Sequence, residues 1–264
     1  MTVAMVEKPN NLGLPHFKST VDNSLTWRLW HGINYMIGGI TFVLGSIVYH
    51  PAINAKVNGD VLGGWLFTVG SAAFLLADLT EWNHFKMGCV TSTDHEGEIS
   101  NTFYAKFRRV EFGLNFFGST IGSLLYLLGS IFFIPATNML ELGETLFIWG
   151  SLIIFFSQAW KCYRASYTNE LDDNDKSVRC SNINADFPGF MVDLWAGLGG
   201  GFYAYGTHVF SYIKTDWDLL LSVYLFIMGG TSFFLSGVFM QYRYFCKEYK
   251  RESFVLKETE VSTI

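Results

Sequence analysis

Two stretches of this chain nearly repeat one another and decide its fold: residues 37–51 (IGGITFVLGSIVYHP) and residues 121–135 (IGSLLYLLGSIFFIP). Each is apolar, contains two glycines seven positions apart, and ends at a proline. Seven residues make two helical turns, so both glycines lie on one helix face with a drift of ~20°. Small residues on one face let membrane helices approach closely. The two stretches therefore predict closely packed transmembrane helices.

The same seven-residue spacing of small residues recurs in six apolar stretches. These stretches cover residues 31–50, 62–82, 111–134, 143–163, 190–213 and 219–241, and each is close to the ~20 residues that cross a bilayer core as a helix. We interpret the paired small residues as a helix-packing seam, formed by Gly38 and Gly45, Gly63 and Gly70, Gly122 and Gly129, Gly143 and Gly150, Gly199 and Gly206, and Ser222 and Gly229.

The six stretches group into three similar hairpins. We expect an all-α polytopic membrane protein with six transmembrane helices in three parallel two-helix repeats, related by an axis along the membrane normal. The predicted divisions are a tail at 1–30, hairpins at 31–85, 111–164 and 190–242, connecting segments at 86–110 and 165–189, and a second tail at 243–264.

Composition and charge agree with a membrane protein. Only 16% of the residues are charged, against about 25% in soluble domains. Of the 18 Lys and Arg residues, all but Lys56 and Lys214 fall on the side of the two tails and the long connecting segments. Cytoplasmic loops carry the excess of positive charge, so both termini are predicted to be cytoplasmic. The four cysteines fall on that same side, where thiols stay reduced.

The motifs of the first two hairpins resemble a known family. The first hairpin carries Leu44-Gly45-Ser46-Ile47, a short loop, and then residues 64–71 (GWLFTVGS). The second carries Arg109-Val110-Glu111 through Asn115, then residues 128–133 (LGSIFF) and 146–151 (LFIWGS). Both resemble the YrhK-like domain, a small membrane module of two helices, and the third hairpin resembles it more loosely. The resemblance implies the fold and assigns no activity.

Ionisable and amide side chains inside the apolar stretches form a candidate polar cluster. Acids in membrane helices are costly unless they are paired, so they are functional candidates. Asp78, Glu111 and Asp193 come from three different hairpins, each near one end of its helix. We expect them to meet as an interhelical ionic ring, paired with Arg28, Arg108, Arg109 or Arg164. Asn34 and Asn115 are expected to hydrogen-bond between helices or to face a solute path.

No catalytic, cofactor or metal motif is recognisable in the chain. We therefore expect a non-enzymatic protein of the lipid bilayer that binds no nucleic acid and acts by assembly with itself or with a membrane-protein partner. A passive channel or facilitator for a small solute or ion along the pseudo-threefold axis is the alternative. The sequence leaves open which membrane holds it, and whether Ser262-Thr263-Ile264 at the C-terminus binds a strand-addition domain.

Overall fold

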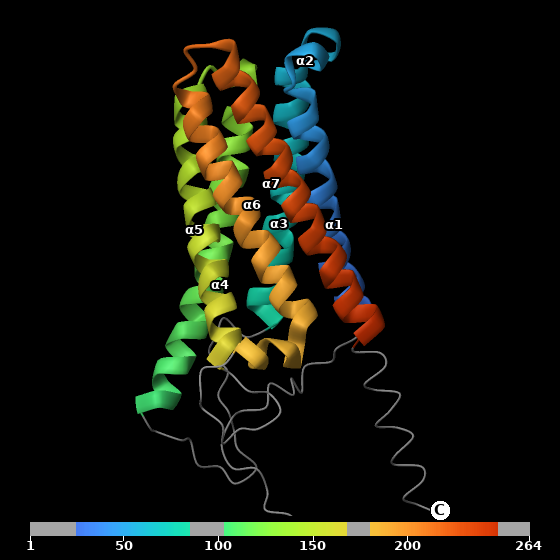
Figure 1. Ribbon diagram of the computed structural model, residues 1–264, viewed down its shortest axis with the longest axis vertical. Helices are drawn as coiled ribbons and strands as arrows, with labels where there is room; N and C mark the ends of the chain where they lie inside the picture. Colours follow the sequence, from blue (N-terminus) through green and yellow to red (C-terminus); the bar gives the residue numbers. More distant parts are fainter. Residues whose placement is uncertain (1–24, 85–102, 168–179, 248–264) are drawn as a thin grey trace, which may run out of the picture.

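Six long helices run side by side in the computed structural model, which describes residues 25–84, 103–167 and 180–247 (Figure 1). The long helices are α1 (Leu25–Val48), α3 (Gly59–His84), α4 (Phe103–Phe132), α5 (Leu140–Tyr167), α6 (Phe187–Ser211) and α7 (Asp216–Tyr242). Four short elements join or extend them: α2 (Pro51–Val57), the 3₁₀ turns η2 (Pro135–Thr137) and η3 (Cys180–Asp186), and the π-helical turn η4 (Arg243–Lys247). Those three ranges contain no strand.

Each predicted apolar stretch lies almost entirely within one long helix, but the helices extend beyond the stretches. The helix α4 begins at Phe103, so the last part of the predicted connecting segment 86–110 is helical. The predicted short loop after the first helix also contains a helix, α2. Its N-cap, His50, accepts a hydrogen bond from Ala52 N at 3.3 Å, and Pro51 occupies a first-turn position where its missing N–H costs nothing.

The two short elements α2 and η2 each begin with a proline, and each is followed by an asparagine whose backbone is left-handed. Asn58 has φ 53° after α2, and Asn138 has φ 54° after η2. Asparagine tolerates this conformation better than most residues, because its short side chain can hydrogen-bond locally. Gly59 then starts α3 where a Cβ atom would lie 2.0 Å from Val48 O. These tight turns place consecutive helices next to each other and antiparallel.

The long helices form a closed ring. In the order α1, α3, α4, α5, α6, α7 each packs against the next, and α7 packs back against α1. The start of α1 and the end of α7 therefore meet at one end of the bundle. There Arg28 Nη1 donates to Tyr244 O at 3.3 Å, and the His31 ring lies 2.8 Å from the Tyr244 hydroxyl.

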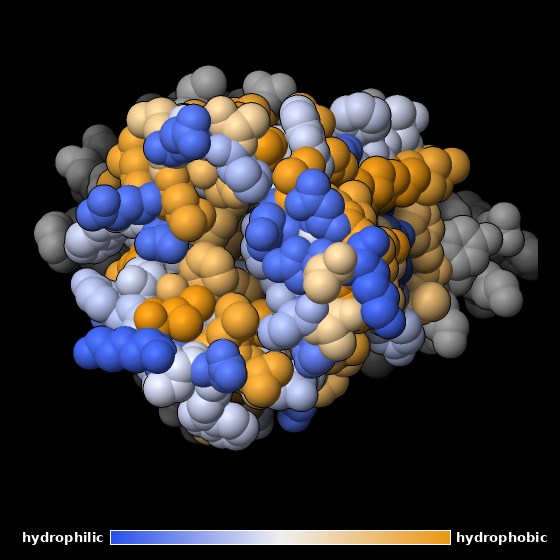
Figure 2. All heavy atoms as spheres, turned by 90° about the horizontal axis from the view of Figure 1, so that it is seen from above, coloured by the Kyte–Doolittle hydropathy of each residue, from blue (hydrophilic) through white to orange (hydrophobic). Residues whose placement is uncertain are grey.

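Five of the long helices are long and apolar enough to cross a membrane: α1, α3, α4, α5 and α7. The sixth, α6, has 25 residues and packs between α5 and α7, but it is rich in glycine and is not among the five. Large apolar side chains face outward along the ring, at 3–4 residue intervals in α1 for example (Ile33, Ile37, Ile40 and Leu44). At the end that carries α2, Figure 2 shows hydrophilic side chains over the helix ends with hydrophobic ones between them.

The inside of the ring is filled by aromatic rings. The core comprises Phe42, Tyr49, Phe67, Phe74, Tyr126, Phe133, Phe147, Ile154, Ala196, Tyr203, Val223, Phe226 and Phe233. The rings pack directly on one another, with Tyr126 and Phe147 centroids 4.4 Å apart and Phe42 and Tyr203 centroids 5.2 Å apart. The bundle is thus held by aromatic packing, with backbones drawn together where glycines occur.

Candidate functional site

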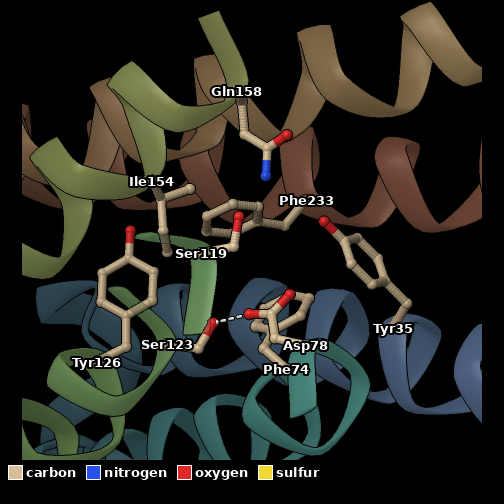
Figure 3. Close-up of a pocket in the computed structure, with 9 residues that line it drawn as sticks. All are labelled: Tyr35, Phe74, Asp78, Ser119, Ser123, Tyr126, Ile154, Gln158 and Phe233. Atoms are coloured by element: carbon tan, nitrogen blue, oxygen red, sulfur yellow. Dashed lines mark hydrogen bonds between the residues drawn. The ribbon is translucent and has the colours of Figure 1, made fainter. Parts of the chain in front are cut away.

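A small cavity with both polar and apolar walls lies inside the ring, beside the aromatic core. Its volume of about 20 Å³ is enough for roughly one water-sized occupant. Helices α1, α3, α4, α5 and α7 contribute to its wall. It is lined by Tyr35, Phe74, Asp78, Ser119, Ser123, Tyr126, Ile154, Gln158 and Phe233 (Figure 3).

Asp78 is the only ionisable acid among these lining residues. It reaches the cavity because it continues the inward face of α3: Phe67, Phe74 and Asp78 follow one another at helical intervals of seven and four. From α4, Ser123 donates a hydrogen bond to Asp78 Oδ2 (Figure 3). One carboxylate oxygen is thereby held by a neighbouring helix.

Gln158 enters the cavity from the opposite side, on α5. Figure 3 shows its amide group pointing into the space above Asp78 and Ser119. The side chain is only 5% exposed, and its Oε1 has no hydrogen-bond partner among the described residues. A buried amide oxygen without a partner is costly; Figure 3 shows that the amide nitrogen, rather than this oxygen, points toward Asp78.

The hydroxyl groups of the cavity wall are held in place by other helices. Ser119 Oγ on α4 lies 3.1 Å from Ser157 Oγ on α5. The Tyr126 hydroxyl accepts a hydrogen bond from Ser151 Oγ at 3.0 Å. Each oxygen keeps at least one further lone pair. The cavity therefore presents several fixed oxygen atoms and one carboxylate.

A set of charged residues lies between this cavity and the end of the bundle where α1 begins. Lys161 on α5 interacts electrostatically with Glu81, Asp193 and Asp78, the contribution of Glu81 being the largest. Arg164 and Arg243 add positive charge near Glu81 and Asp193. Opposite charges at this depth compensate one another, which lowers the cost of placing them near lipid.

The predicted ionic ring is only partly reproduced. Asp78 and Asp193 both interact electrostatically with Lys161, a residue that the predicted ring did not include. Asp193 also interacts with Arg164. Asp78 receives its hydrogen bond from Ser123 rather than from an arginine. Arg28 points to the end of α7. The side chains of Glu111, Arg108 and Arg109 lie outside the described residues, as does the C-terminal segment Ser262-Thr263-Ile264.

The two asparagines behave differently. Asn115 Nδ2 donates to Ser157 O at 3.0 Å, and Ser157 Oγ donates to Asn115 O at 3.3 Å, so this pair joins α4 to α5. Asn34 is buried but donates to Trp30 O of its own helix at 2.8 Å. The expectation of an interhelical hydrogen bond therefore applies to Asn115 and not to Asn34.

The glycines of the predicted seam lie against aromatic rings or backbone of a neighbouring helix. A Cβ atom on Gly38 would lie 2.6 Å from the Phe74 ring, and one on Gly229 would lie 2.6 Å from the Tyr203 ring. Gly129 lies against the backbone of α5. Corresponding contacts join the other seam glycines to a neighbouring helix: Gly45 to Phe67, Gly63 to Tyr49, Gly70 to Phe42, Gly122 to Ile154, Gly143 to Phe132, Gly150 to Leu125, Gly199 to Phe233, and Gly206 to Phe226. Ser222 is fully buried and bonds to Leu219 O.

Sequence reasoning missed most of the cavity. Gln158 occupies the position in the second hairpin that Asp78 occupies in the first, counted from Gly150 and Gly70. From this correspondence between the hairpins, the proximity of the two side chains could have been predicted. The described residues include no group of three or more His, Cys, Asp or Glu side chains that could hold a metal ion. Their three cysteines, Cys162, Cys180 and Cys246, are free thiols.

Comparison with known proteins identifies one family. Residues 26–77 match the family model described as YrhK-like protein, which confirms the resemblance over α1, α2 and most of α3. No curated protein and no solved structure matches the chain. The match supports a two-helix module in this part of the chain and implies no reaction or ligand.

Proposed function

We propose that this chain, whose first hairpin is YrhK-like, is a non-enzymatic membrane protein that acts by assembly with itself or with a partner membrane protein. All six long helices cross the bilayer in this proposal, and both termini are cytoplasmic. The three hairpins are parallel repeats around one axis, and lipid surrounds the ring.

The six spans are supported by the position and surface of α6. It completes the ring between α5 and α7, and its glycines face inward toward neighbouring helices. It also exposes large side chains, among them Phe187, Leu198 and Tyr205. A helix without this surface would interrupt the apolar outer face of the ring.

The threefold arrangement is supported by equivalent side chains in equivalent places. Each first helix carries an aromatic residue three positions before its second seam glycine, and all three are completely buried: Phe42, Tyr126 and Tyr203. Each second helix repeats this with Phe67, Phe147 and Phe226, which are at most 2% exposed. The sequence repeat and the aromatic core thus share one pattern.

The observation that carries the functional proposal is the packed aromatic core. A solute moving along the axis would have to displace rings that contact one another, such as Tyr203 and Phe226 with centroids 5.6 Å apart. Interiors packed in this way have few voids larger than a water molecule. A protein built like this presents its outer surface, rather than a passage, to other molecules.

The proposal is tested by reconstituting the protein into lipid nanodiscs and proteoliposomes. We expect native mass spectrometry to find more than one copy per assembly, or a copurified membrane protein, and we expect no flux of ions, urea or glycerol above that of empty liposomes. The variant Phe147→Ala, which opens the aromatic core, serves as a positive control for detecting flux.

If the protein is instead a passive channel, we expect the opposite results in both measurements, the copy number and the flux. A wild-type protein that is monomeric and carries a solute at a rate that falls in the variant Asn115→Leu would contradict our proposal. Asn115 is the informative choice because it joins α4 to α5, and Asn54→Leu, at a polar site in α2, is the matched control.

A further inference from the structure

We infer that the axial cavity beside the aromatic core is a binding site for one small monovalent cation, Na⁺, with Asp78 as its charged ligand. This assignment goes beyond the assembly role and does not depend on it. The cavity is the place where a carboxylate, a buried amide and ordered hydroxyls from different helices meet.

The first argument is the chemistry of the donor atoms. Hard cations prefer oxygen ligands: carboxylates, amide and backbone carbonyls, and water. The polar atoms of the wall are the carboxylate of Asp78, the amide of Gln158, and hydroxyls, among them that of Ser119. The wall includes no thiol and no imidazole, which are the ligands that transition metals favour. The set therefore suits a hard cation.

The second argument is the amide of Gln158, which is buried at the cavity. Turning the amide about its last torsion exchanges nitrogen and oxygen with little change of shape. It then directs Oε1 toward the space that Asp78 borders. Figure 3 shows the two side chains on opposite sides of the cavity. A cation between them would then contact an oxygen of each side chain.

The third argument is the charge balance around Asp78. The charged groups that act on it are Lys161, which attracts it, and Glu81, which repels it. Lys161 is shared, since it interacts more strongly with Glu81 and Asp193 than with Asp78. A carboxylate inside a membrane helix is costly unless it is paired, and one cation in the cavity would add to the pairing that Lys161 provides.

The fourth argument is size and position. A volume of about 20 Å³ accommodates one ion of the size of water and no larger ligand. The aromatic core closes the cavity on one side, and the charged residues around Lys161 lie on the other. The size of the site therefore suits a single bound ion.

The experiment measures thermal unfolding and ²²Na⁺ binding of the purified protein in nanodiscs. At constant ionic strength, replacing choline chloride by NaCl is expected to raise Tm progressively with the logarithm of the Na⁺ concentration, because a ligand that binds only the folded state stabilises it. Equilibrium binding of ²²Na⁺ is expected to approach one ion per chain. The variant Asp78→Asn is expected to lose both effects.

The matched control is Asp60→Asn, an acid of the same helix that is exposed at its other end and bonded to Asn54 at 2.8 Å. It should keep the full Na⁺ response. If Asp78→Asn does not fold, Gln158→Leu and Ser119→Ala test the site instead. Each is expected to raise the half-saturating Na⁺ concentration by about tenfold, as loss of one supporting ligand does in other metal sites.

Two results would overturn the assignment. One is a wild-type protein that binds no ²²Na⁺ and has the same Tm in NaCl and choline chloride. The other is a Na⁺ response that survives in Asp78→Asn, or that keeps the wild-type half-saturating Na⁺ concentration in Gln158→Leu. Neither result bears on the oligomeric state, so the assembly proposal is judged separately.

Discussion

At the scale of single residues, buried serines join the helices. Ser46 lies on α1 and touches three groups: Phe42 O at 2.7 Å, the Tyr203 hydroxyl at 2.8 Å and Phe226 O at 3.0 Å. It thus connects the first hairpin to both helices of the third. Ser71 on α3 similarly meets Ser130 on α4 at 3.0 Å. The small side chains therefore carry hydrogen bonds between helices in addition to allowing close approach.

The variant Ser46→Ala is expected to destabilise the protein by about 0.6–1.7 kcal/mol, the range for interhelical hydrogen bonds in membranes. The change leaves the buried Tyr203 hydroxyl with only Phe42 O, at 3.3 Å. Reversible unfolding in mixed detergent measures the effect. Thr145→Ala, which removes a hydroxyl bonded to Glu141 O of its own helix, should change the free energy of unfolding much less. Equal losses in the two variants would show that the bond to the third hairpin adds nothing.

At the scale of helices, glycines set how closely the pairs pack. The contact that closes the ring, between α7 and α1, depends on Gly230 and Gly39. A Cβ atom at Gly230 would lie 2.8 Å from Val43 N and 2.9 Å from Phe42 C and O. At Gly39 it would lie 2.6 Å from Phe234 Cα. Backbone atoms cannot turn away as side chains can, so any side chain here pushes the helices apart.

We expect Gly230→Ala to destabilise the bundle by about 1–3 kcal/mol, the usual cost of overpacking. Gly118→Ala is the matched control, because its Cβ would meet only Ser157 Oγ at 3.9 Å. Alanine favours a helix over glycine by about 1 kcal/mol, so the control should be neutral or stabilising. Thermal melting in nanodiscs compares them, and a Gly230→Ala protein as stable as the wild type would show that α1 and α7 separate without cost.

At the scale of the whole molecule, charge is divided between the two ends of the ring. Lys56 in α2 and Lys214 between α6 and α7 lie at one end, while Lys161, Arg164 and Arg243 lie toward the other. The start of α1 and the end of α7 also lie at this second end of the ring. This division supports the proposal that the richly basic end is cytoplasmic.

Cysteine labelling in intact cells tests this orientation. In a variant with Cys89, Cys162 and Cys246 changed to Ser, the exposed thiol of Cys180 should react with an impermeant maleimide only after the cells are permeabilised. In a variant without cysteines, a cysteine introduced at the exposed Lys214 should react at once. Labelling of Cys180 from outside intact cells would reverse the proposed topology.

The sequence alone was sufficient for the helical class, the approximate positions of all six long helices and the YrhK-like character of the first hairpin. Apolar length and glycine spacing are local properties, so they can be read along the chain. The helix limits were less accurate, as the early start of α4 at Phe103 shows, because helix ends depend on capping and on neighbouring elements more than on hydropathy.

Only the tertiary structure decided which side chains meet inside the ring. Asp78, Ser123 and Gln158 come from three helices, and their approach depends on how far each helix is rotated and shifted against its neighbours. A glycine face in the sequence shows that helices can approach, but it does not specify which aromatic ring fills the space. The charged partners of the acids differ from the predicted ones for the same reason. Lys161 lies among the acids because α5 packs between α4 and α6. Periodicity determines which face of a helix is buried, whereas packing in three dimensions determines what that face touches.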